Sequence, residues 1–181
     1  MEFTARFTQS RETAEAFNRG ERAALQAFID GDGDNAATDG VTAGSVALNA
    51  SDAWAHGLRA DVLLWTGRIE ESIAAAETAF RFDPRIRGEI GFDLAFAYYL
   101  SGRYREALAM ADRQVGRSDA YFAHALRAAA LAQLGELEQA RLAAQEVRRL
   151  QPFFDTKTFG ARFVDPALRD KAQEGLRKAG L

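Results

Sequence analysis

The sequence predicts an all-α protein built from stacked antiparallel helix pairs, and three observations support this prediction. Proline occurs only 3 times in 181 residues, helix-forming residues dominate, and the alternating Val, Ile and Thr of β-strands are missing. The stretch "AHGLRA" at 55–60 returns as "AHALRA" at 123–128, an offset of 68 residues or two units of 34. Glycines follow apolar stretches at Gly67, Gly102 and Gly135. A repeat of this length is typical of a helical solenoid.

Composition narrows the range of functions. The chain is 48% hydrophobic and 27% charged, which predicts a folded protein. Its formal net charge of −3 argues against a nucleic-acid partner. The absence of cysteine excludes disulfides, thiol catalysis and cysteine metal sites. The first residues lack the apolar core of a signal peptide or membrane helix, so we expect a cytoplasmic protein without a membrane partner.

The expected elements run in order along the chain. Residues 1–18 form a helical extension, residues 19–154 form the repeats, and residues 155–181 form a loop and a capping helix. We place the repeats at 19–52, 53–87, 88–120 and 121–154. In each repeat a glycine between the two helices allows the positive φ that the reversal requires.

The C-terminal helix has its own signals. Asp165 followed by Pro166 is an N-cap with a first-turn proline, which predicts a helix over 166–179 that ends at Gly180. Its expected apolar face consists of Ala167, Leu168, Ala172 and Leu176.

The acidic stretch "IDGDGDNAATDG" at 29–40 resembles the start of a calcium loop. An EF-hand loop needs Gly at its sixth position and Glu at its twelfth, but Asn35 and Val41 stand there. Gly33 lies 34 residues before Gly67, at the expected turn of the first repeat. We therefore interpret the stretch as a helix-stopping turn, and we expect no metal and no cofactor.

The repeat pattern resembles the tetratricopeptide repeat (TPR) family. Small residues stand where that family's two helices cross, and a large residue follows three positions after the first of them. The small residues are Ala60, Ala95 and Ala128 in the first helices and Ser72, Ala107 and Ala140 in the second; the large ones are Leu63, Tyr98 and Leu131. The family's bulky early residue and the following Leu are replaced by His56 and Arg59, and again by His124 and Arg127. The resemblance implies a right-handed superhelix.

The resemblance also implies a concave groove lined by the first helices. An aromatic-rich strip is expected there, centred on the third repeat, with acidic residues at its edge. The expected groove residues are Trp54, Asp61, Leu64, Trp65, Glu89, Phe92, Phe96, Tyr99 and Phe122. Aromatic side chains on such a surface make good anchors for a partner. The alternative is that a neighbouring helix or a terminal segment of the same chain fills the groove.

Two functional hypotheses follow. The first is a non-enzymatic interaction module that binds a peptide or protein segment in this groove. On this hypothesis, Phe96→Ala should lower the affinity for the partner and leave most of the fold's stability in place. The second is a regulatory or self-associating module of a nucleotide cyclase or transcription regulator. It rests on the resemblance of "DP…GLRKAGL" to the ends of TPR modules attached to bacterial class III cyclases and winged-helix regulators.

Catalysis and carboxylate capture are not expected. The sequence has no nucleophile elbow, phosphate-binding loop or zinc-protease motif. His56 and His124 stand two repeats apart and cannot share a metal, so we expect helix-packing roles for them. No Lys falls within 19–154, which argues against the carboxylate clamp of chaperone-binding TPR domains.

Overall fold

The computed structural model describes residues 46–47, 49–86, 88–115, 121–163 and 165–181. The expected N-terminal extension, the turn at Gly33, the acidic stretch at 29–40 and most of the expected first repeat lie outside these residues. The predictions made for them stay predictions.

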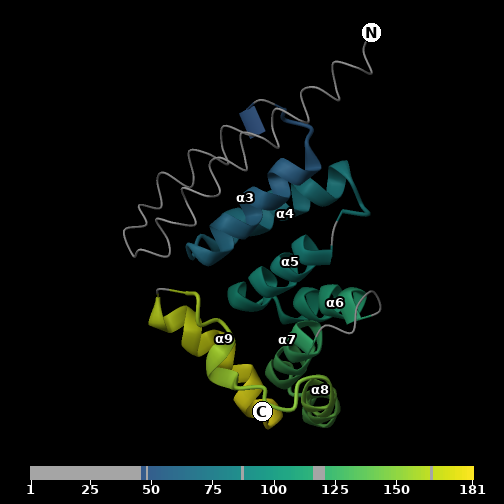
Figure 1. Ribbon diagram of the computed structural model, residues 1–181, viewed down its shortest axis with the longest axis vertical. Helices are drawn as coiled ribbons and strands as arrows, with labels where there is room; N and C mark the ends of the chain where they lie inside the picture. Colours follow the sequence, from purple (N-terminus) through teal and green to yellow (C-terminus); the bar gives the residue numbers. More distant parts are fainter. Residues whose placement is uncertain (1–45, 48, 87, 116–120, 164) are drawn as a thin grey trace.

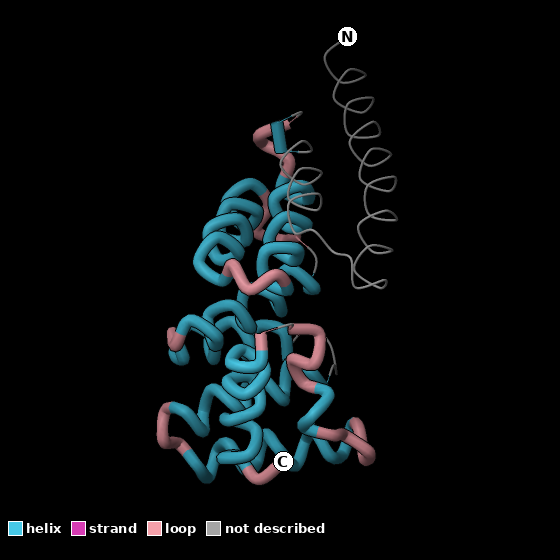
Figure 2. Tube along the Cα trace, turned by 90° about the vertical axis from the view of Figure 1, so that its left-hand side faces the viewer, coloured by secondary structure: helices cyan, strands magenta, loops and turns pink. Residues whose placement is uncertain are grey.

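The described residues form an all-α solenoid, as the sequence predicts. The helices are α3 (Ala53–Trp65), α4 (Ile69–Phe82), α5 (Gly88–Ser101), α6 (Tyr104–Val115), α7 (Tyr121–Gln133), α8 (Leu137–Leu150), the short 3-10 helix η1 (Thr156–Thr158) and α9 (Pro166–Ala179). Figure 1 shows the pairs α3/α4, α5/α6 and α7/α8 stacked in chain order, with α9 running obliquely beside α5 and α7. Figure 2 shows the loops that join the described helices.

Three glycines reverse the chain inside the helix pairs. Gly67, Gly102 and Gly135 have φ of 81°, 86° and 83°, a region that side chains with a β-carbon rarely adopt. Each follows the first helix of a pair, so the predicted role of these glycines is confirmed.

The small residues let the two helices of each pair approach closely. Ala60 of α3 and Ser72 of α4 are fully buried, and the Ser72 hydroxyl donates to the Ala60 carbonyl at 2.7 Å. Ala95 with Ala107, and Ala128 with Ala140, are also fully buried in the next two pairs. Small residues at these positions allow close helix packing, while the larger residues beside them fill the core.

His56 has a packing role at the end of the first pair. Its ring stacks on Phe82 of α4 with centroids 5.7 Å apart, and its Nε2 lies 3.0 Å from the carbonyl oxygen of Ala50. His124 lies on α7, half-buried.

Helix α9 forms where the sequence predicts it. The Asp165 carboxylate accepts from the backbone N–H of Ala167 at 2.8 Å, and Gly180 ends the helix at φ 90°. Its buried face differs in part from the expected one, because Ala167 is exposed while Gly175 and Ala179 are buried. The face turns this way because Gly175 lies directly against Ala129 of α7.

Candidate functional site

The aromatic residues expected in the groove do gather across three helices. Phe92 and Phe96 of α5 have ring centroids 5.8 Å apart, and Phe92 contacts Phe122 of α7 at 5.7 Å. Phe96 contacts Trp65 of α3 at 5.8 Å. These four rings form a continuous row across α3, α5 and α7, which we name the aromatic strip.

The expected groove residues differ widely in exposure. Leu64, Phe96 and Tyr99 are all fully buried. The residues Trp54, Asp61, Trp65 and Phe92 are half-buried, and Phe122 is 42% exposed. Only the backbone of Glu89 is described. Leu64, Phe96 and Tyr99 are therefore closed to a partner in this conformation.

The chain's own C-terminal part covers the middle of the strip. We name residues 154–163, between α8 and α9, the aromatic loop. Its Phe159 ring lies 5.1 Å from that of Phe96, and its Phe163 ring lies 4.9 Å from that of Trp65. Both loop phenylalanines are buried. At this place the structure agrees with the alternative that the sequence left open, in which a terminal segment of the same chain packs on the groove.

A cation lies over the end of the strip. The guanidinium carbon of Arg162, in the aromatic loop, is 4.2 Å from the Trp65 ring centroid. The Trp65 indole N–H donates to the Asp61 carboxylate at 2.7 Å. The carboxylate polarises the indole and adds negative charge beside the ring, so this corner favours a positively charged group.

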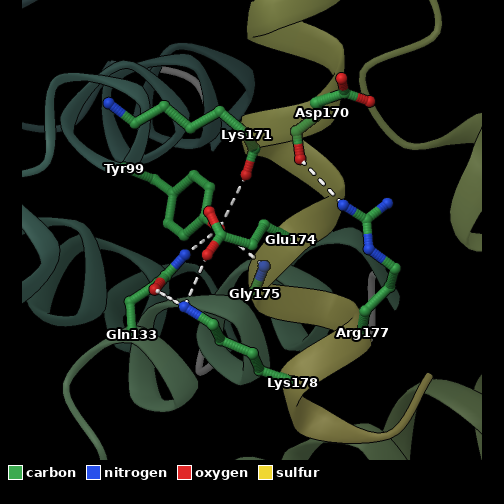
Figure 3. A network of polar contacts seen from close by, with 8 residues as sticks. All are labelled: Tyr99, Gln133, Asp170, Lys171, Glu174, Gly175, Arg177 and Lys178. Carbon is green, nitrogen blue, oxygen red and sulfur yellow. Dashed lines mark hydrogen bonds and ion pairs between the residues drawn. The ribbon is translucent and has the colours of Figure 1, made fainter.

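Tyr99 of α5 attaches α9 to the solenoid (Figure 3). Its hydroxyl donates to the carbonyl of Lys171 at 3.0 Å and accepts from the backbone N–H of Gly175 at 3.1 Å. The Gln133 amide of α7 lies 3.4 Å from the same oxygen, and Lys178 donates to the other end of that amide at 2.8 Å. Burial raises the pKa of Tyr99. The neutral phenol is therefore the form that joins α5, α7 and α9.

Sequence reasoning did not assign a role to Phe159, Arg162 and Phe163. The stretch "FFDTKTFGARF" at 153–163 carries four of the chain's phenylalanines, which is an unusual composition for an exposed loop. This density of phenylalanines was the sequence feature that could have indicated a packing role for the loop. It does not say which surface the rings pack against, since this depends on how the loop folds back.

Two absences hold for the part of the chain that the structure describes. It contains no group of three or more His, Asp or Glu side chains placed to bind a metal ion. Within the same residues, no helix combines the length and apolar character needed to cross a membrane.

Comparisons of sequence and structure give different results. No protein-family model matches the sequence, and no curated protein matches it. Solved structures do match. YrrB, a TPR protein with an unusual peptide-binding site, superposes with a TM-score of 0.62 at 18% identity, over 92% of this chain and 90% of YrrB.

Two structures of MamA match over a similar extent. The MamA RS-1 double mutant has a TM-score of 0.68 at 14% identity, over 91% of this chain and 93% of its own. The MamA AMB-1 structure has a TM-score of 0.64 at 13% identity, over 94% of this chain and 91% of its own. The repeated turn glycines, the small residues at the helix crossings and these superpositions agree that the fold of this chain is that of the tetratricopeptide repeat proteins.

Proposed function

We propose that this chain is a non-enzymatic interaction module that binds a peptide or protein segment along the inner face of its first helices. The observation that carries the proposal is the aromatic strip, which runs without interruption from Trp65 through Phe96 and Phe92 to Phe122. Large aromatic side chains dominate the energetics of protein interfaces. The structural neighbour YrrB has a peptide-binding site on a solenoid of the same fold, which supports the same use here.

The accessible end of the strip is the expected first contact for a partner. Phe122 is 42% exposed, and Phe92 beside it is half-buried. Tyr121 stacks on Phe122 with centroids 4.3 Å apart and adds aromatic surface at the same end of α7. We propose the cytoplasm as the compartment in which this surface meets its partner.

Selection from a random-peptide display library tests the proposal. The full chain is the bait, and the affinity of each selected peptide is then measured on variants. Phe122→Ala should weaken these peptides by at least about ten-fold, the loss expected for an interface anchor.

Phe82→Ala is the matched control, because Phe82 is also a partly exposed phenylalanine but lies on the second helix α4. It should leave binding unchanged. Equal losses in both variants, or no loss with Phe122→Ala, would argue that the inner face is not the binding surface.

A further inference from the structure

We propose that the aromatic loop is an internal occupant of the partner groove, and that the groove's external ligand shares its chemistry. That ligand is a segment of another protein with two aromatic side chains four residues apart and a basic residue directly before the second. In the loop these places hold Phe159, Phe163 and Arg162. The inference rests on the proposed function and names the class of partner.

The two loop rings occupy separate places on the strip. Phe159 lies between Phe96 and Phe122, with centroids 5.1 Å and 6.2 Å away. Phe163 lies against Trp65 and Phe96, at 4.9 Å and 5.7 Å. The strip therefore offers two ring sites one after the other along the solenoid, and this spacing favours a ligand with a matching pair of rings.

The third place is the corner at Trp65. Arg162 is exposed, yet its guanidinium lies over the Trp65 ring on the side of the molecule where Asp61 accepts the indole N–H. A ring face with a carboxylate at its edge attracts cations and disfavours acidic side chains. The preference for a basic residue beside the second aromatic follows from this corner.

The backbone of the loop is organised mainly by short-range contacts. Thr158 and Phe159 donate to the carbonyls of Asp155 and Thr156, and Phe163 donates to that of Gly160. Asp155, Lys157, Thr158 and Ala161 are exposed. The rings of Phe159 and Phe163 thus make the main apolar contact between loop and strip. Gln173 of α9 also donates to the carbonyls of Lys157 and Phe159 at 3.2 and 3.3 Å. The loop therefore leaves the strip by losing these ring contacts and these two hydrogen bonds.

Helix α9 has an anchor of its own. Gly175 lies so close to α7 that an added β-carbon would be 2.6 Å from the Ala129 carbonyl oxygen, and Tyr99 bonds to the same turn. Because α8 and α9 hold both ends of the loop, displacement of the loop leaves the solenoid and its cap in place. A tethered occupant acts at a high effective concentration, so it weakens an external ligand of the same chemistry.

The test supplies the loop in trans. The probe is a fluorescent synthetic peptide of residues 156–165, and its binding to the full-length chain is followed by anisotropy. The variant Phe159→Ala/Phe163→Ala, which has vacated ring sites, should bind this peptide at least about ten-fold more tightly than the wild-type chain. Phe153→Ala is the matched control, because Phe153 belongs to the same aromatic stretch but is 93% exposed; it should behave like the wild type.

Peptide variants check the chemistry. The peptide with Phe159→Ala and Phe163→Ala should not bind the vacated groove, and the peptide with Arg162→Glu should bind several-fold more weakly than the original. Equal binding of the original and the ring-free peptide would overturn the proposal. So would a folded double variant, with unchanged helicity, that binds no peptide.

If the double variant does not fold, hydrogen exchange on the wild-type chain tests whether the aromatic loop opens independently of the solenoid. Backbone amides of 156–163 should then exchange at least about ten-fold faster than those of α5 and α7, as local opening requires. Exchange of the loop together with those helices would overturn the proposal. Light scattering that shows a dimer with exchanged loops would also overturn it, since the occupant would be a second copy.

The outcomes separate this inference from the proposed function. Library peptides that bind through Phe122 but lack the aromatic and basic pattern would support the function and reject the inference. A vacated groove that binds the loop peptide, in a chain that selects no library peptide, would support the internal occupant and reject the partner-binding function.

Discussion

The inner faces of α5 and α7 occupy equivalent places in successive repeats, yet different elements pack on them. The face of α5 carries Phe92, Phe96 and Tyr99, whereas equivalent places of α7 hold Ala125, Ala129 and Ala132. The aromatic loop packs its rings on Phe96 of the α5 face and reaches Phe122 at the start of α7. Helix α9 lies close on Ala129 of the α7 face and bonds to Tyr99 of α5.

Side-chain size explains this division. The small alanine side chains of α7 allow the backbone of α9 to approach closely at Gly175. A β-carbon on Gly175 would meet both the carbonyl and the α-carbon of Ala129. The rings on α5 stand out from the helix and leave gaps that other rings fill, as Phe159 and Phe163 do. In this solenoid the residues at one set of repeat positions decide whether a helix or a ring-bearing loop covers the groove.

Among the substitutions that test this comparison, Phe96→Ala should have the largest effect on stability. Phe96 is 1% exposed and contacts four rings of α3, α5 and the aromatic loop. Its loss leaves a cavity and should lower the free energy of unfolding by about 3–5 kcal/mol, measured by urea denaturation. This burial reverses the expectation drawn from the sequence, in which the strip was not needed for stability. Phe153→Ala, the exposed control, should stay within about 0.5 kcal/mol of the wild type.

Ala95→Leu and Ala128→Leu test the packing that α5 and α7 share. Both alanines are fully buried, so the added carbon atoms force the helices apart and should cost about 1–3 kcal/mol each. Thermal melting provides the measurement. An unchanged melting temperature in both variants would show that the repeat positions are assigned wrongly.

Gly175→Ala tests the close approach of α9 to the alanine face of α7. Alanine favours a helix by about 1 kcal/mol over glycine, but its β-carbon would lie 2.5 Å from the Tyr99 hydroxyl and 2.6 Å from the Ala129 carbonyl. Backbone atoms of α7 cannot move aside cheaply, so we expect a net loss of about 1–2 kcal/mol in urea unfolding. A gain in stability would show that α9 does not approach α7 this closely.

Tyr99→Phe should have a smaller effect. The hydroxyl lies between the Lys171 carbonyl and the Gly175 N–H, groups four residues apart that ordinarily pair within a helix. Without the hydroxyl they can pair with each other, so the loss should be only about 0.5–1 kcal/mol. Hydrogen exchange of the Gly175 amide, compared between variant and wild type, measures how firmly α9 stays attached.

Tyr98 lies on the side of α5 that faces α4. Its replacement should have the smallest effect on stability, and that effect should depend on pH. Burial, together with the hydrogen bond that its hydroxyl donates to Glu77 at 2.8 Å and that carboxylate's charge, raises its pKa to about 12. The folded state holds this proton more tightly than the unfolded chain. Its contribution to stability is therefore complete below about pH 10 and is lost as the pH rises toward 12. Melting temperatures across this range should fall less steeply in Tyr98→Phe.

The sequence alone determined the repeat architecture. The 34-residue spacing, the turn glycines and the small residues at the helix crossings are local requirements of a helix pair, so each leaves a periodic signal. Asp165, Pro166 and Gly180 determined the bounds of α9 in the same way, because capping acts within one turn. The association with nucleotide cyclases or transcription regulators stays a prediction based on the end of the chain.

Only the tertiary structure decided what occupies the groove. Phe96 and Phe159 are 63 positions apart in the sequence, and no periodic pattern links them. Whether Phe96 meets solvent, a partner or its own chain depends on how the loop after α8 folds back, and in the structure Phe159 and Phe163 of that loop fit against it. Such a fit is a property of two surfaces in contact, and neither segment of sequence contains it alone.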